Sequence, residues 1–360
     1  MDWSTFRLSR RLDFGAETTA TAYRLLSEID SIKKGWSIIG KLQPATITRL
    51  TQSVIVTSTG ASNRIEGNRL SDEEVEALYQ NLRIKKFKTR DEQEVAGYLE
   101  LLEMIFDNHG AMELSESLIL DIHSRMLRHS AKDERHRGSY KFGSNRVEAK
   151  GGEGNVVGII FEPTAPHLVD KEMKDLLAWY EWAKTEDFRH PLLLLGNFLF
   201  EFLAIHPFQD GNGRSSRLLT NLLLLKEDYQ FAQVVSHEQL VESRKADYYL
   251  ALNQSQRSWK SDSEDIGPWL VFFLETLSTQ AEKAFALLSE EDEESLLSSN
   301  QQKILGWAES RSEESFSRKE VIEGLGLPAS TVEGAIRKLL ALKRVERFGQ
   351  GRATRYRVST

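Results

Sequence analysis

The chain has 360 residues, of which 40% are hydrophobic and 28% charged, proportions typical of a folded globular protein rather than a disordered one. Its net charge of −7 argues against nucleic-acid binding over the whole surface, and the lack of cysteine excludes disulfides and thiolate metal sites. No basic and then apolar leader opens the sequence, and Asn197 and Glu201 interrupt the most apolar run, which begins at Leu192. We therefore expect a cytoplasmic protein of two or three domains without a membrane span.

Residues 1–90 are predicted to be mostly helical, because apolar positions recur at helical spacing in residues 22–32 and 47–56. The Gly67-Asn68 pair indicates the end of a helix, and Ser71 with Glu74 predicts a capping box at the start of the next one. Further helices are expected over residues 92–106, 115–127 and 166–190. His123 lies within the second of these, where we interpret it as a packing residue rather than a catalytic one.

A short β-hairpin is predicted between these helices. The segment from Gly138 to Pro163 is rich in glycine, and β-branched residues become frequent from Val156 to Phe161. A surface loop without a function is the alternative interpretation of the same composition.

The segment His206-Pro-Phe-Gln-Asp-Gly-Asn-Gly-Arg-Ser-Ser-Arg217 separates two strongly apolar runs, which predicts two buried helices joined by a polar turn. Gly211 and Gly213 allow the backbone to approach a ligand closely, and the N-terminus of the second helix favours an anion. Arg214 and Arg217 are three residues apart, so both could reach that anion. His206 and Asp210 are candidates for a general base and a divalent-cation ligand.

The C-terminal sixty residues differ in composition from the rest of the chain. An acidic, serine-rich stretch precedes a boundary near Ser298, and helices are predicted over residues 301–309, 317–325 and 328–342. A β-hairpin is expected from Val345 to Val358. Twelve Lys and Arg against seven Glu give residues 301–360 a balance of +5, which leaves −12 for the remainder.

The segment from His206 to Arg217 resembles the signature of the Fic family, His-Pro-Phe-x-Asp-Gly-Asn-Gly-Arg-x-x-Arg, and matches it at all ten defined positions. The resemblance implies a mainly α fold, an all-helical core with a β-hairpin flap, and transfer of AMP from ATP to a Ser, Thr or Tyr hydroxyl of a target protein. His206 would be catalytic and Asp210 would bind Mg²⁺. ATP would contact a larger set, namely Gly211, Asn212 (through backbone and side chain), Gly213, Arg214, Ser215, Ser216, Arg217, Tyr248 and Tyr249. The two tyrosines could instead only anchor their helix to the core, and Ser243 departs from the asparagine frequent before Arg244 in the family.

Two further segments resemble parts of Fic proteins. Ser62, Glu66 and Gly67 match the inhibitory motif Ser/Thr-x-x-x-Glu-Gly/Asn, which implies that Glu66 pairs with Arg217 and blocks its contact with ATP. Residues Val157, Gly158 and Ile159 match the flap in position and would dock a target segment by strand addition. The implied division is an N-terminal helical region with the inhibitory motif over 1–90, a core over 91–280, an acidic linker over 281–300 and a small domain over 301–360.

Several rival activities remain open. Family members that transfer phosphate carry lysine where Gly213 stands, and phosphocholine-transferring members lack the second arginine, so Gly213 and Arg217 argue against both. Removal of AMP from a modified protein would use the same residues, with Glu66 orienting a water molecule. A transcription regulator that senses ATP is an alternative from another class. Dimerisation is common in the family, so a homodimer is possible, although no sequence feature establishes it.

The C-terminal region resembles a winged helix-turn-helix domain, with three helices and a two-stranded wing. Its positive balance suggests DNA binding, with phosphate contacts from Arg337, Lys338, Arg352 and Arg355. Because winged helices also bind proteins, DNA and protein both remain open as partners.

Overall fold

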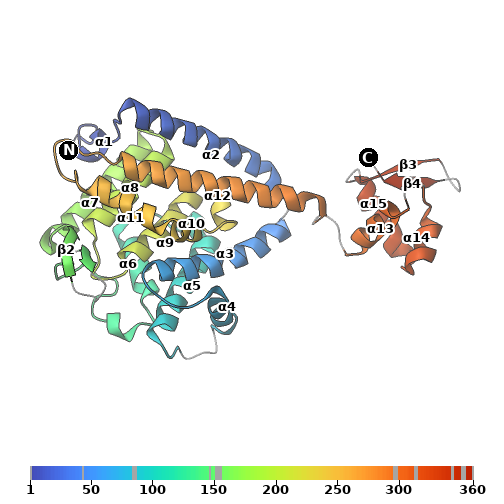
Figure 1. Cartoon of the computed structure of the whole chain (residues 1–360), viewed down its shortest axis with the longest axis horizontal. Coiled ribbons are helices and arrows are strands. Elements are labelled where there is room, and N and C mark those ends of the chain that lie inside the picture. The colour runs from blue at the N-terminus through green and yellow to red at the C-terminus, as the bar shows by residue number, and fades with distance from the viewer. Residues whose placement is uncertain are drawn as a thin grey trace. The chain divides into compact units, whose positions relative to one another are not determined.

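The structure is a computed structural model that describes residues 2–42, 44–82, 87–145, 147–150, 156–294, 299–311, 315–341, 344–349 and 354–358. The chain divides into two compact units, Met1–Phe285 and Ala286–Thr360. Both are dominated by helices, so the predicted mainly α fold class is confirmed (Figure 1). Among the described residues, no helix has the length and apolarity that crossing a membrane requires.

The larger unit is a bundle of helices with one small sheet (Figure 1). Its α-helices are α1 Arg7–Arg10, α2 Ala16–Leu42, α3 Pro44–Ile65, α4 Asp72–Asn81, α5 Arg90–Asn108, α6 Glu116–Met126, α7 Pro166–Thr185, α8 Pro191–Ile205, α9 Asn212–Lys226, α10 His237–Ser243, α11 Lys245–Gln256 and α12 Gly267–Glu294. Single 3₁₀ turns lie at His109–Ala111, Ala131–Asp133 and Gln230–Gln233. The capping box that the sequence predicts at Ser71 and Glu74 begins α4.

Helix α8 lies at the centre of this unit, since every residue from Leu192 to Ile205 is buried. Its apolar side chains pack against α7 and α9 on either side. Its Gly196 faces α12 so closely that an added Cβ would lie 2.6 Å from Leu270 Cδ2. The predicted buried helix therefore forms the core, and its C-terminal end carries His206.

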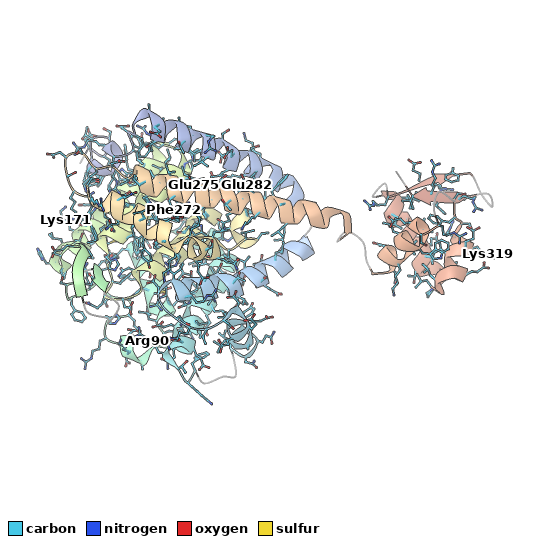
Figure 2. The ribbon with its side chains drawn as sticks, in the orientation of Figure 1. Arg90, Lys171, Phe272, Glu275, Glu282 and Lys319 are labelled. Carbon is cyan, nitrogen blue, oxygen red and sulfur yellow. The ribbon has the colours of Figure 1, made fainter. Side chains whose placement is uncertain are left out.

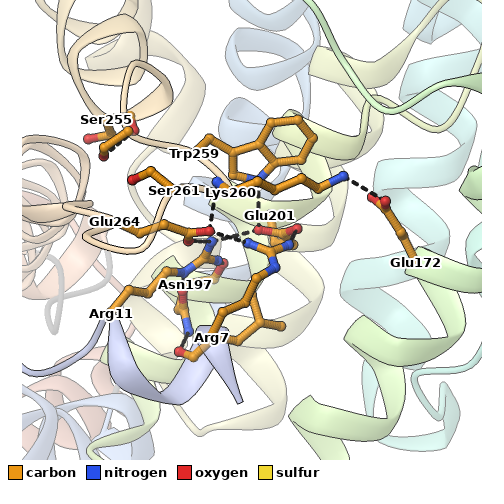
Figure 3. Close-up of polar contacts among 12 residues, drawn as sticks. Arg7, Arg11, Glu172, Asn197, Glu201, Ser255, Trp259, Lys260, Ser261 and Glu264 are labelled. Carbon is orange, nitrogen blue, oxygen red and sulfur yellow. Dashed lines mark hydrogen bonds and ion pairs between the residues drawn. The ribbon is translucent and has the colours of Figure 1, made fainter. Parts of the chain in front are cut away.

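The two polar residues within α8 meet Arg7 of α1 and Arg11, which follows that helix directly (Figure 3). Arg11 donates to Asn197 Oδ1 at 2.5 Å and pairs with Glu201 and Glu264 at 2.6 and 3.0 Å. Arg7 pairs with the same two carboxylates. These buried charges are mutually neutralised, which a buried ion requires. The cluster fastens the start of the chain to α8.

The sheet of the larger unit is a hairpin of β1 Val147–Lys150 and β2 Val156–Phe161. The strands are antiparallel, with Ala149 opposite Gly158 and Glu148 opposite Ile159. The predicted hairpin is thus present. Phe161, at its end, packs with a ring-centroid distance of 5.2 Å against Trp259, whose indole N–H donates to Glu201 of the charged cluster.

The smaller unit contains α13 Ser299–Glu309, α14 Arg318–Leu325, α15 Ala329–Ala341 and the antiparallel pair β3 Val345–Phe348 and β4 Arg355–Val358. Three helices and then a hairpin is the order that the sequence predicts. Its core includes Phe316 and Tyr356, whose backbones exchange two hydrogen bonds of 2.7 and 2.8 Å. The capping box of Ser317 and Glu320 begins α14 as predicted.

Candidate active site

The turn between α8 and α9 is closed by its own side chains. His206 ends α8 in the left-handed conformation at φ 52°, and Gly211 at φ 81° precedes α9. The Asn212 amide accepts from Phe208 N and donates to Phe208 O, both at 2.8 Å. Both ends of the Asn212 amide therefore hold the turn in this conformation. Its backbone N–H still lies at the start of α9.

A buried histidine on α6 supports the same turn. His123 Nδ1 accepts from Gly138 N at 2.9 Å, so its Nε2–H donates to the Asp210 carbonyl at 3.0 Å. The ring stacks on Phe208 with centroids 3.8 Å apart and planes 1° apart. Burial lowers the pKa of His123 to about 4, which keeps the ring neutral. His123 is thus a packing residue, as interpreted from the sequence, and it also positions the turn.

His206 has the geometry of a general base. Its Nδ1–H donates to the Leu203 carbonyl at 3.2 Å, which leaves Nε2 without a proton in this tautomer. Burial lowers the pKa of His206 to about 4, and the nearby Lys141 contributes in the same direction. The imidazole is therefore neutral near pH 7 and can accept a proton at Nε2.

The two arginines of α9 are buried at its first turns. Arg214 Nη1 lies 3.2 Å from Glu94 Oε2, and Arg214 Nη2 lies 3.5 Å from Asp210 Oδ1. Arg217 donates from Nε to Ser62 Oγ at 2.8 Å and from Nη2 to Ser62 O at 3.0 Å. Arg214 Nε and Arg217 Nη1 are buried without a hydrogen-bond partner among the described residues. Buried guanidinium N–H groups without acceptors fit a site for an anion.

Glu66 occupies the position that the inhibitory motif implies. Its Oε1 lies 2.8 Å from Arg217 Nη2, so the predicted ion pair is present. The carboxylate also lies directly against Gly213, where a Cβ would clash with Oε1. Burial would raise the pKa of Glu66, but the charge and hydrogen bond of Arg217 outweigh it and hold the pKa below its usual value.

A left-handed glycine at the end of α3 holds Glu66 in place. Asn68 N donates to Asn63 O and Gly67 N to Arg64 O, both at 3.0 Å, with Gly67 at φ 96°. This is the Schellman arrangement, in which glycine avoids the penalty of a side chain. A carboxylate at a helix C-terminus is unfavourable by itself, so Glu66 depends on its cationic partner.

Asp210 is the candidate metal ligand. Its side chain is 43% exposed, and its Oδ2 lies 3.3 Å from Arg90 Nη2 at the start of α5 (Figure 2). Burial would raise its pKa, but Arg214, the Gly211 N–H and Arg90 keep it lower than usual. Among the described residues no group of three or more His, Asp or Glu could hold a metal ion. A single accessible carboxylate suits Mg²⁺, which keeps several waters and takes further ligands from a substrate.

The remaining predicted contacts divide between core and surface. Ser215 and Ser216 are buried in α9, and Ser215 Oγ has no hydrogen-bond partner among the described residues. Tyr248 is buried, and its ring centroid lies 5.8 Å from those of Trp269 and Phe272. This position favours the alternative that Tyr248 anchors its helix to the core over stacking on a base. Tyr249 is 44% exposed and remains available to a ligand.

The flap residues Val157, Gly158 and Ile159 lie in β2. Their side chains fall outside the described residues, so only the backbone placement is available. In the smaller unit, Arg337 on α15 is 78% exposed. Lys338 (its side chain) and Arg352 also lie outside the described residues.

Arg355, another candidate DNA contact, binds residues of the smaller unit itself. Its guanidinium donates to Ser315 Oγ at 2.7 Å and to Ser315 O at 2.5 Å, and it lies 3.3 Å from Glu320. The group therefore ties the hairpin to α14, while its side chain remains 42% exposed.

Four site residues escaped the sequence interpretation. Glu94 holds Arg214, and Arg90 reaches Asp210. Lys141 donates to Asn145 Oδ1 at 2.7 Å and to Ile205 O at 3.2 Å, while Asn145 donates to Phe208 O at 2.6 Å. Lys141 and Asn145 thus connect the segment before β1 to the turn. No local pattern distinguishes these residues from surface polar residues.

The fold and the site define a helical protein that places a neutral histidine and two buried arginines around an anion site at a helix N-terminus. Residues 113–224 match the model of the Fic/DOC family.

Comparisons with whole proteins agree. The chain is 30% identical over 220 residues to "Protein adenylyltransferase Fic" of Nematostella vectensis and 28% identical over 193 residues to "Protein adenylyltransferase fic-1" of Caenorhabditis elegans. These alignments cover 59% and 52% of the chain, but only 44% and 34% of the relatives. A Fic family protein from Desulfovibrio desulfuricans shares the fold, with a TM-score of 0.62 at 24% identity over 94% of this chain and 96% of that one. Fic-1 from C. elegans aligns with a TM-score of 0.59 at 20% identity, over 76% and 74% of the two chains.

Proposed function

We propose that this protein transfers AMP from ATP to a hydroxyl side chain of a target protein. The observation that carries the proposal is a neutral His206 at the end of α8, followed in α9 by buried arginine N–H groups that lack acceptors among the described residues. The anion site at the start of α9 suits the phosphates of ATP, and Nε2 of His206 is free to take the hydroxyl proton. The named activity of the Nematostella and Caenorhabditis relatives supports the same reaction.

The reaction divides into one bond formed and one broken. The target hydroxyl oxygen attacks the α-phosphorus while its proton passes to His206 Nε2. The bond from the α-phosphorus to the bridging oxygen of the β-phosphate breaks, and pyrophosphate leaves. Backbone N–H groups at Gly211, Asn212 and Gly213 stabilise the charge that develops on the phosphate oxygens. The chain thus contributes position, a base and electrostatic stabilisation.

Arg214 and Arg217 bind the β- and γ-phosphates in this proposal. The unpartnered Arg214 Nε and Arg217 Nη1 are the donors that such oxygens would satisfy. Asp210 would hold Mg²⁺, and the ion would supply charge neutralisation on the phosphates. The exposed Tyr249 edges the base, and the backbone of β2 accepts the target segment as an added strand.

Glu66 inhibits the transfer by occupying Arg217. The pair leaves one guanidinium nitrogen, Nη1, for the γ-phosphate, and the carboxylate against Gly213 repels any anion that approaches. ATP therefore binds weakly or with its α-phosphorus out of line. Withdrawal of Glu66 switches the enzyme on.

Labelling with radioactive ATP tests the proposal. Wild type, Glu66→Gly and Glu66→Gly/His206→Ala are incubated with Mg²⁺ and either α-³²P-ATP or γ-³²P-ATP. We expect label from the α-position alone, strongest in Glu66→Gly and lost from the double variant. Label from the γ-position would mean phosphate transfer. Equal label in wild type and Glu66→Gly would refute the inhibitory role.

Removal of AMP is a second candidate, favoured by the carboxylate of Glu66 at the edge of the phosphate site beside Gly213. There it could orient a hydrolytic water molecule. The labelled product of Glu66→Gly, re-isolated and mixed with wild type, distinguishes the two directions. Release of labelled AMP by wild type but not by Glu66→Gly would establish the removal reaction.

We also propose that the smaller unit is a winged-helix module that binds DNA or a protein. The exposed Arg337 on α15 supports a phosphate contact. An electrophoretic shift with duplex DNA, with and without ATP, tests this role. A shift that Arg337→Ala abolishes supports DNA binding, and no shift at low salt rejects it.

A further inference from the structure

The end of α3, which carries Glu66, is fastened to α10 by a second ion pair. Arg64 Nε donates to Glu242 Oε1 at 2.7 Å, and Nη2 donates to Oε2 at 2.9 Å. The arrangement is bidentate, the strongest form of an arginine–carboxylate contact. The two side chains are 24% and 28% exposed, so water screens the pair only in part.

The same guanidinium also braces the chain that follows Glu66. Its Nη1 donates to Asp72 Oδ1 at 2.8 Å and to Leu70 O at 3.2 Å. Gly60, one turn earlier on α3, leaves the space for this contact, since a Cβ there would lie 2.6 Å from Arg64 Nη1 and would also clash with Asp72. Arg64 thus joins α3, α4 and α10 at one point.

The contact with α10 reaches Glu66 through the backbone. The Arg64 carbonyl accepts from Gly67 N in the Schellman turn, and Glu66 lies between these two residues. Lys245, at the start of α11, donates from Nζ to the Ile65 carbonyl at 2.6 Å. Displacing Arg64 or Ile65 would therefore move Glu66 as well.

We propose that Arg64 and Glu242 form a latch that holds the Glu66 turn in its inhibitory position, so that opening the latch releases Arg217 while Glu66 itself is intact. Arg64 and Glu242 are positioning residues in this assignment, because neither touches the site of transfer. The proposal rests on the inhibition proposed above. Helix α11, which follows α10 directly, carries Lys245 and Tyr249, so a shift of this helix pair when a nucleotide or target binds would open the latch.

A latch makes a distinctive prediction for single and double substitutions. Glu242→Gln and Arg64→Met each remove the ion pair, and methionine retains the apolar stem of the arginine. Each variant should bind a ribose-labelled fluorescent ATP about threefold to tenfold more tightly than wild type, the range that one partly exposed ion pair supports. The double variant should gain no more than Arg64→Met alone, because that single variant already lacks the ion pair with Glu242.

The matched control is Glu275→Gln. Glu275, on α12 (Figure 2), pairs with Arg244 at 2.9 Å, and these side chains, 42% and 37% exposed, are more accessible to water than those of Arg64 and Glu242. This variant should bind ATP as wild type does. Melting temperatures of all variants identify any that fail to fold.

Hydrogen exchange separates failure of the latch from failure of the proposed function. Amides of residues 66–68 should exchange about threefold to tenfold faster in Glu242→Gln than in wild type, whatever the enzyme catalyses. Unchanged exchange overturns the latch. Faster exchange with unchanged ATP affinity also overturns it, provided that Glu66→Gly binds ATP more tightly. If Glu66→Gly itself binds ATP no better than wild type, the proposed inhibition fails, while the exchange data still decide whether the ion pair holds the turn.

Discussion

Replacing His123 should reveal how much stability the buried histidine supplies and how that contribution depends on pH. The ring is completely buried, accepts from Gly138 N, donates to the Asp210 carbonyl and stacks on Phe208. His123→Ala removes these contacts and leaves a partly buried N–H and a partly buried C=O without these partners. Losses of this kind cost about 1–3 kcal/mol for each polar group, and the cavity adds to them. We expect the free energy of unfolding to fall by about 3–5 kcal/mol at pH 7.5.

The pH dependence follows from the lowered pKa. His123 titrates near 4 in the folded protein and near 6.5 when unfolded, so the unfolded state takes up the proton first. Its stabilising contribution is complete above pH 6.5 and is lost as the pH falls toward 4. At 1.36 kcal/mol per pKa unit, the loss amounts to about 3 kcal/mol.

Urea unfolding followed by tryptophan fluorescence between pH 7.5 and 4.5 measures both effects. The stability curve of His123→Ala should decline less steeply with acid than that of wild type, so the two curves converge. The control is His167→Ala, which removes an exposed histidine of α7 and should give a curve parallel to wild type. Parallel curves for wild type and His123→Ala would refute the assignment of His123 as a buried neutral group.

Three further predictions concern the core and the base. Arg11→Met removes a buried partner of the Glu201 carboxylate. In urea titrations it should lower the free energy of unfolding by about 3–5 kcal/mol. A change below about 1 kcal/mol would contradict the stabilising role of this charged cluster. Gly97→Ala places a Cβ against the Met126 carbonyl. In the same titrations it should lower the free energy of unfolding by about 1–3 kcal/mol. An unchanged free energy would mean that α5 and α6 can separate freely. The rate of AMP labelling by an uninhibited variant should show no inflection near pH 6.5. The rate should fall only as the pH approaches 4, because His206 stays neutral until then. A midpoint near pH 6.5 would contradict the lowered pKa of His206.

The catalytic turn was predictable because its parts are local. His206 and Arg217 lie on two helices that the apolar runs define, and the residues between them are too few to adopt many arrangements. One further contact lies within the turn itself. Asn212 bonds the backbone four residues earlier, as a short amide at a helix start readily does, rather than pointing toward a ligand.

Contacts between residues far apart in the sequence could be predicted only where a motif resembled that of a known family. The Glu66–Arg217 pair joins residues 151 apart and was expected on that ground alone. The Arg64–Glu242 pair spans 178 residues and has no sequence signal, since its register depends on how α3 and α10 pack. Tyr248 and Tyr249 are adjacent in sequence, yet successive helix residues point in different directions, so one is buried and the other exposed.

The ion pair at Glu66 links the proposed inhibition to stability, which gives a final prediction. Arg217 is 3% exposed, and Glu66 is the carboxylate that pairs with it among the described residues. Glu66→Ala leaves this buried cation with the Ser62 contacts alone, so the free energy of unfolding should fall by about 1–3 kcal/mol. ATP restores an anion beside Arg217 and should therefore raise the melting temperature more in the variant than in wild type, by the amount that its tighter binding dictates.

Thermal unfolding is measured with and without Mg²⁺ and ATP. A concentration of about 1 mM ATP would saturate a site with an affinity near ~10 μM. The comparison tests this coupling. Ser62→Ala is the matched comparison, because it weakens the hold on Arg217 but keeps the carboxylate. Ser62→Ala should lower the melting temperature without increasing the rise in melting temperature that ATP produces. If Glu66→Ala melts at the temperature of wild type and responds equally to ATP, then Arg217 does not depend on Glu66 for its charge balance. Inhibition would then have to act by shape rather than by charge, through the carboxylate packed against Gly213.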